Sequence, residues 1–169
     1  SDAPTSSEAL RGAARRRVAS PELFTHRESP LEHGMNPLIA IPTTSSVHAM
    51  TMASVFRTCT SFPGPVGFQS FVVEPLSMAR NAAVEHLLAS DWSHLMLVDP
   101  DIELTDDAML RLLAMDVPIA SGLYPLHLPG AGLCLSAAVE SEPGRFQFVI
   151  DRPDGPTEAD ATGLGCCLI

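Results

Sequence analysis

The sequence predicts an α/β protein with a mainly parallel, Rossmann-like sheet, helices on both faces and a C-terminal β-hairpin region. Between residues 37 and 121, short apolar runs alternate with segments of helical periodicity. The apolar runs are continuous, which is typical of parallel strands buried on both faces. Beyond Gly122 this alternation stops, and two strand-like segments flank Glu142-Pro143-Gly144.

The individual elements follow from periodicity and from turn residues. Strands are expected at 37–42, 66–73, 94–98 and 117–121, helices at 46–60, 76–89 and 105–115, and the hairpin strands at 133–140 and 145–151. Ser46, Ser77 and Thr105 are the expected helix caps, because their side-chain oxygens can accept hydrogen bonds from free backbone N–H groups. The stretch Thr162–Ile169, which ends in four apolar residues, is expected to enter the sheet as a further strand.

Composition divides the chain at about residue 35. Residues 1–34 are rich in Ser, Ala, Pro and charge without a periodic apolar face, which predicts a flexible N-terminal extension before one domain at 35–169. Residues 1–36 hold as many arginines as acidic residues, so the net charge of −10 belongs to residues 37–169. Such an acidic domain repels phosphate backbones, which argues against a nucleic-acid partner. Without an apolar run of membrane-spanning length, the sequence predicts a cytoplasmic protein.

The most informative stretch is His94–Asp101, an apolar strand followed by Asp99-Pro100-Asp101. Ligands of open parallel sheets bind beyond the carboxyl ends of the strands, where this strand delivers both carboxylates. Two carboxylates so close repel each other unless they share a cation. Mn²⁺ or Mg²⁺ suits the pair, because these ions bind one or two carboxylates together with substrate phosphates and water. The alternative is an ordinary polar loop at the end of a strand.

Five ordered landmarks of this chain resemble the family-2 GT-A glycosyltransferases, in particular their compact bacterial and phage versions. The landmarks are Ile41-Pro42-Thr43, Ala79-Arg80-Asn81, the aspartate pair, Gly122-Leu123-Tyr124-Pro125 and Gly163-Leu164-Gly165. The resemblance implies a domain that binds a UDP- or GDP-linked sugar through a divalent metal and transfers the sugar to a hydroxyl acceptor.

The resemblance also implies roles for individual residues. Pro42 and Thr43 would lie beside the nucleoside, and Arg80 near the diphosphate, where a guanidinium pairs well with phosphate oxygens. Asn81 would brace the loop. Asp99 would approach the ribose or the metal, and Asp101 would ligate the metal.

Three of these landmark residues also have purely structural interpretations. Arg80 could form an ion pair on the helix surface with Glu85 or Glu74, Asn81 could cap the helix, and Tyr124 could serve in packing.

The chain departs from the family pattern at its C-terminus. Inverting members need a carboxylate base, usually well past the Gly-x-Gly strand, and this chain ends at Ile169 inside that strand. Asp151, Glu158 and Asp160 are weak candidates, so the catalytic residue stays unknown and the domain is expected to be incomplete. The alternative function is therefore a catalytically inactive binding or structural module in a larger, virion-associated assembly. An open apolar C-terminal edge predicts a homodimer or an assembly partner.

Overall fold

The computed structural model describes residues 34–128 and 132–169, which form two compact units. One unit comprises 34–124 together with 163–169, and the other comprises the described residues between 125 and 162. The extension expected at residues 1–34 lies outside the described residues, apart from Gly34. No helix of the described ranges is long and apolar enough to cross a membrane.

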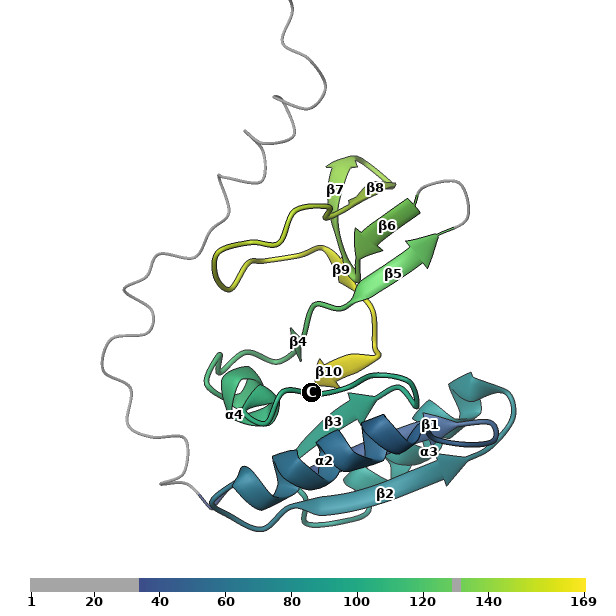
Figure 1. The fold of residues 1–169 in the computed structure, drawn as a ribbon, viewed down its shortest axis with the longest axis vertical. Coiled ribbons are helices and arrows are strands. Elements are labelled where there is room, and N and C mark those ends of the chain that lie inside the picture. Colours follow the sequence, from purple (N-terminus) through teal and green to yellow (C-terminus); the bar gives the residue numbers. More distant parts are fainter. Residues whose placement is uncertain (1–33, 129–131) are drawn as a thin grey trace, which may run out of the picture. The chain divides into compact units, whose positions relative to one another are not determined.

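A five-stranded sheet forms the centre of the first unit (Figure 1). Its strands lie in the order β2 (Gly67–Val72), β1 (Pro37–Thr43), β3 (His94–Val98), β10 (Cys166–Leu168) and β4 (Ala120–Ser121). β1 is parallel to β2 and β3, whereas β10 is antiparallel to both β3 and β4. The C-terminal strand is thus inserted between two strands that precede it in the chain.

The prediction of a mainly parallel, Rossmann-like sheet is wrong. Apart from the two pairings of β1, every strand pairing in the described residues is antiparallel, including those of two smaller sheets. The reason is that a short run such as Cys166-Cys167-Leu168 is buried along its whole length. Its apolar pattern predicts a buried strand but does not distinguish a parallel from an antiparallel one. Because both edges of β10 are hydrogen-bonded, this strand is also not the open C-terminal edge that we expected.

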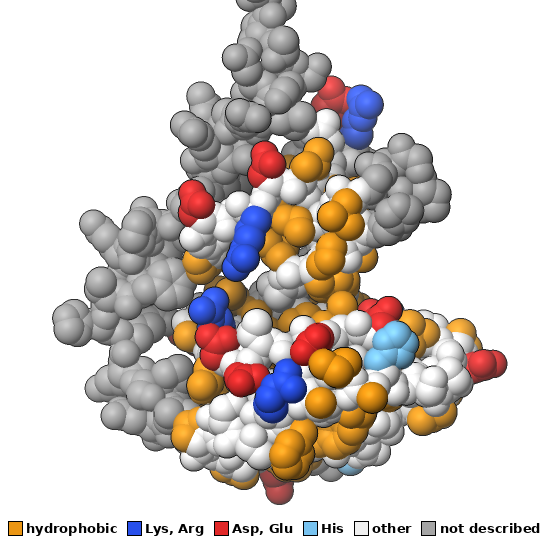
Figure 2. Space-filling view, in the orientation of Figure 1, with side chains coloured by type: hydrophobic (Ala, Val, Ile, Leu, Met, Phe, Trp, Pro, Cys, Tyr) orange, Lys and Arg blue, Asp and Glu red, His pale blue; other side chains and the backbone are white. Residues whose placement is uncertain are grey.

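Helices cover both faces of this sheet, and each face has its own core. Side chains alternate along a strand, so Ile39 and Ile41 of β1 join one core while Leu38 and Ala40 join the other. The first core includes side chains of α2 (Ala49–Ser61) and α4 (Ala108–Leu113), and the second includes side chains of α3 (Leu76–Leu88). Hydrophobic side chains are also exposed around α2 and β2 (Figure 2). Phe56 of α2 and Phe68 of β2 are among the exposed large hydrophobic residues.

The helices do not begin at the expected caps. The N-caps are His48, Pro75 and Asp107, and none of them makes a side-chain capping bond. α4 is shorter than expected because Thr105 forms a turn instead: its hydroxyl donates to Asp107 and its carbonyl accepts from the Ala108 amide.

The second unit consists of small antiparallel sheets. β5 (Pro125–Leu128) pairs with β6 (Gly132–Leu135), and β7 (Ala137–Glu142) lies between β8 (Arg145–Phe148) and β9 (Ala161–Thr162). The β7–β8 hairpin turns at Pro143-Gly144, as the sequence predicts, and Gly144 adopts a φ of 76° that favours glycine.

Candidate functional site

The carboxyl ends of β1 and β3 bring the aspartate pair next to the C-terminal segment. These two strands are parallel neighbours, so the residues that follow them emerge at the same edge of the sheet. The Asp99 amide, directly after β3, donates a 2.8 Å hydrogen bond to the Gly165 carbonyl. Asp99 is therefore fixed by its backbone to the segment that leads into β10.

An ion pair joins Arg80 of α3 to Asp99 across this edge. The Arg80 Nη2 atom lies 2.7 Å from Asp99 Oδ1, and the side chains are 25% and 22% exposed. Neither Glu74 nor Glu85 takes this role. The Arg80 Nε atom is buried and has no hydrogen-bond partner among the described residues. The guanidinium thus keeps hydrogen-bonding capacity beyond its bond to Asp99.

Gly165 approaches Asp99 and Tyr124 more closely than any other residue type could. A Cβ atom built on Gly165 would lie 2.7 Å from the Tyr124 hydroxyl and 2.8 Å from Asp99 Oδ2. The Gly165 amide donates a 3.0 Å hydrogen bond to the Tyr124 hydroxyl oxygen. Burial raises the pKa of this hydroxyl, the Gly165 amide opposes the rise, and the negative charge of Asp99 adds to it. Tyr124 is thus a neutral hydroxyl bound into the site.

Asp101 differs from Asp99 in that its side chain is exposed and forms no hydrogen bond or ion pair within the described ranges. The described residues contain no group of three or more His, Cys, Asp and Glu side chains that could hold a metal ion. A cation at Asp101 would therefore need ligands from a substrate and from water. Mg²⁺ and Mn²⁺ accept this arrangement, so the donor set fits the metals that the sequence suggested.

The remaining predicted binding residues are less available to a ligand. Pro42 and Thr43 are buried in β1. The Thr43 hydroxyl donates to the Ser46 carbonyl and accepts from the Ser45 amide, so it stabilises the turn after β1. Asn81 is exposed on α3 and makes no hydrogen bond through its side chain with other described residues, so it neither caps the helix nor braces a loop there.

The three candidate bases belong to the second unit. Asp160 Oδ2 accepts a 2.8 Å hydrogen bond from the Glu140 amide, so this carboxylate stabilises the small sheet. Asp151 and Glu158 are exposed in segments outside the strands. Unlike Asp160, neither Asp151 nor Glu158 accepts a hydrogen bond from a strand amide within the described residues.

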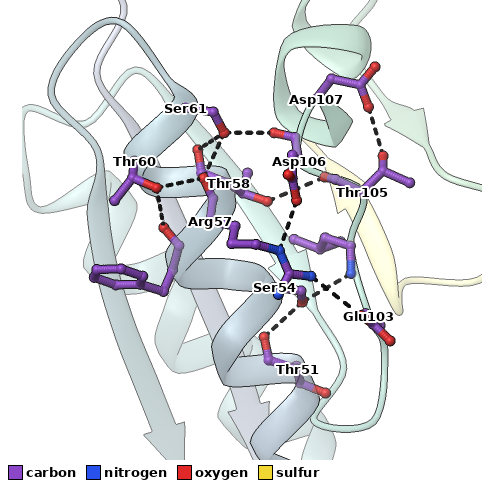
Figure 3. Close-up of polar contacts among 12 residues, drawn as sticks. Thr51, Ser54, Arg57, Thr58, Thr60, Ser61, Glu103, Thr105, Asp106 and Asp107 are labelled. Atoms are coloured by element: carbon purple, nitrogen blue, oxygen red, sulfur yellow. Dashed lines mark hydrogen bonds and ion pairs between the residues drawn. The ribbon is translucent and has the colours of Figure 1, made fainter.

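Sequence reasoning missed the polar face of α2. The apolar Met50 is exposed, and the buried residues of the helix are Thr51, Ser54, Val55 and Thr58. The hydroxyl groups on this face contact the loop that contains Asp101 (Figure 3). The available signal was the recurrence of Ser and Thr at positions 51, 54, 58 and 61, which share one helix face.

Comparison with known proteins reveals a fold relationship. No protein-family model matches the chain, and no curated protein matches it. The chain is similar to the crystal structure of A197 from STIV, with a TM-score of 0.51 and 19% sequence identity. The match covers 80% of this chain and 64% of A197, so the chain spans less than two thirds of the length of that relative. At this identity the similarity is one of fold alone.

Proposed function

We propose that the chain binds a UDP- or GDP-linked sugar through Mn²⁺ or Mg²⁺ and transfers the sugar to a hydroxyl acceptor. The observation that carries the proposal is the convergence of Arg80, Asp99 and Gly165 at the carboxyl end of β3. These residues come from three of the landmarks that resemble family-2 glycosyltransferases. The geometry supports a ligand site because it brings a cation, two carboxylates and a close backbone approach to one edge of the sheet.

Each group has a chemical role that its surroundings support. Asp99 is neutralised by Arg80, whereas Asp101 keeps an exposed carboxylate without a partner among the residues that the structure describes. Asp101 would therefore hold the metal, and Arg80 would turn its remaining N–H groups to the phosphate oxygens. The divalent cation, when bound, stabilises the negative charge that develops on the leaving diphosphate.

The reaction breaks the bond between the anomeric carbon of the sugar and the diphosphate oxygen, which keeps the electron pair. A new bond forms between that carbon and the acceptor oxygen, whose proton passes to a base. Asp151 and Glu158 are the candidates for this base that we favour, because the Asp160 carboxylate is hydrogen-bonded to the Glu140 amide.

Calorimetric titration of the full chain with UDP-glucose and GDP-mannose, in Mn²⁺ and in EDTA, tests the proposal. Asp101→Asn should lower the Mn²⁺-dependent affinity at least about tenfold, because it removes a charged ligand. The matched control is Asp91→Asn, an exposed aspartate that precedes β3 at its opposite end. Equal affinity of Asp101→Asn and the parent in Mn²⁺ would contradict the metal site.

The same protein distinguishes an enzyme from a binding module. Release of UDP or GDP in the presence of an added acceptor measures turnover, whereas calorimetry measures binding alone. Mn²⁺-dependent binding without nucleotide release across a panel of hydroxyl acceptors would favour the catalytically inactive module.

A further inference from the structure

The loop from Pro100 to Asp106 carries Asp101 and lies outside the helices and strands. Hydroxyl groups of α2 contact this loop, and Figure 3 shows the contacts made by Ser54 and Thr58. Backbone groups in such a loop need hydrogen-bond partners when water does not reach them. In this loop, side chains and backbone of α2 supply several of these partners.

The contact nearest to the aspartate pair is at the Pro100 carbonyl, which lies between Asp99 and Asp101 in the chain. This oxygen accepts a 2.9 Å hydrogen bond from the His48 amide and a 3.1 Å hydrogen bond from the Thr51 hydroxyl. Thr51 is only 1% exposed, so water does not replace its hydroxyl easily. The carbonyl is thus fixed from two directions at the start of α2.

Further along α2, two more hydroxyl groups form hydrogen bonds with the backbone of the loop. The fully buried Ser54 hydroxyl accepts a 3.0 Å bond from the Leu104 amide and donates a 2.8 Å bond to the Thr51 carbonyl. Thr58 donates a 3.4 Å bond to the Thr105 carbonyl. Residues 51, 54 and 58 lie on one helix face, and their side chains are small enough for the loop to approach closely.

An ion-pair network lies outside these buried contacts. Arg57 lies 3.3 Å from a Glu103 carboxylate oxygen and 2.9 Å from an Asp106 carboxylate oxygen. All three side chains are more than 40% exposed, between 42% and 64%. Solvent and salt screen exposed ion pairs, so these contribute little to stability. Loss of a buried hydrogen bond costs more, so the hydroxyl contacts dominate the placement of the loop.

We propose that Thr51 is a positioning residue of the metal and diphosphate site, because its hydrogen bond to the Pro100 carbonyl fixes the backbone from which Asp99 and Asp101 project. This inference rests on the proposed function. The positioning role gives a reason for the buried hydroxyl groups on this face of α2, which lies next to a hydrophobic core. A metal ligand on a fixed backbone binds without the entropic cost of ordering its loop.

Three variants of the full chain test the inference. Thr51→Val removes the hydroxyl at nearly constant volume, and Thr51→Ser retains it. Thr58→Val is the matched control, because Thr58 is equally buried on the same face but bonds to Thr105, farther along the loop from the aspartates. For each variant, calorimetry with UDP-glucose and GDP-mannose gives the ratio of affinity in Mn²⁺ to affinity in EDTA, and thermal denaturation gives the stability.

We expect Thr51→Val to lower this ratio about fivefold, equivalent to the loss of one hydrogen bond. Thr51→Ser should restore the ratio, and Thr58→Val should lower the thermal stability but leave the ratio unchanged. A parental ratio together with an altered stability in Thr51→Val, or an equal loss in Thr58→Val, would overturn the positioning role. A parent protein that binds neither nucleotide sugar in Mn²⁺ would instead overturn the proposed function and this inference with it.

Discussion

At the scale of single residues, the two aspartates after β3 have different environments despite their spacing of two. Asp99 is held by Arg80 through its side chain and by Gly165 through its backbone. Asp101 is exposed and forms no such contacts with described residues. Asp99 Oδ1 is thus engaged in an ion pair, whereas the Asp101 carboxylate is open to solvent, which is the difference on which the proposed metal-binding role of Asp101 rests.

Gly165 provides the most direct test of how closely this site is packed. In Gly165→Ala the new methyl group would lie within 3 Å of both the Tyr124 hydroxyl and the Asp99 carboxylate, so at least one of them must move. We expect a loss of about 1–3 kcal/mol in the free energy of unfolding, measured by urea denaturation. The Mn²⁺-dependent nucleotide affinity should fall as well, since Asp99 is displaced.

Gly155→Ala is the control for this substitution, because a Cβ atom there has no neighbour within 4 Å. The control should be neutral or slightly stabilising. Unchanged stability and affinity in Gly165→Ala would show that the segment before β10 yields without disturbing Asp99.

Sequence reasoning recognised Arg80, Asp99, Tyr124 and Gly165 but not how they combine. A resemblance of short motifs indicates which residues could belong to a site. It does not predict which side chains pair with each other, because that depends on tertiary structure. For this reason Arg80 pairs with Asp99, 19 residues away in the chain, and not with the nearby Glu74 or Glu85. Likewise, burial raises the pKa of Cys166 to about 11, a consequence of the position of β10 that the sequence does not encode locally.

At the scale of elements, the buried strands β1 and β3 were predictable and the partners of β10 were not. PLIAIP and HLMLV are continuous apolar runs, which fix their identity as strands covered on both faces. The run Cys166–Leu168 has the same character, but three residues carry no information on strand direction or neighbours. Its antiparallel position between β3 and β4 is a feature of the tertiary structure.

β10 should therefore be essential for the stability of the five-stranded sheet. Leu168→Ala removes a side chain that is 4% exposed and belongs to the core beneath α2 and α4, so we expect a loss of about 2–4 kcal/mol in unfolding free energy. The neighbouring Ile169→Ala is the matched control, because Ile169 is 41% exposed while its backbone pairs with Leu95. Chemical denaturation of both variants measures the difference. Similar losses at the two positions would mean that β10 does not contribute to the core as its burial indicates.

At the scale of the whole molecule, the second unit is an insertion between Tyr124 and Gly163 of the first. Three contacts within the first unit hold the two ends of this insertion near each other. The Gly165 amide donates to the Tyr124 hydroxyl, the Ser121 hydroxyl donates to the Gly163 carbonyl, and the Gly122 amide donates to the Cys166 carbonyl. The first unit thus closes on itself without requiring residues 125–162 for its sheet.

This arrangement separates the two halves of the proposed chemistry. Arg80, Asp99 and Asp101 belong to the first unit, whereas Asp151 and Glu158 belong to the second. The first unit contains the residues proposed to bind the diphosphate and the metal. The second contains the candidates for the base that would deprotonate the acceptor.

We therefore predict that replacing residues 125–162 with a flexible Gly-Ser linker of about six residues leaves a folded protein that binds but does not transfer. Circular dichroism should show a cooperative thermal transition, because the five strands and both cores remain. Calorimetry should give a Mn²⁺-dependent affinity for UDP-glucose or GDP-mannose close to that of the full chain, and Asp101→Asn in the shortened protein should lower it at least about tenfold, as in the full chain. Nucleotide release with an acceptor that supports turnover by the full chain should disappear. Loss of binding in a shortened protein that still unfolds cooperatively would show that the second unit contributes donor contacts, and continued turnover would exclude Asp151 and Glu158 as the base.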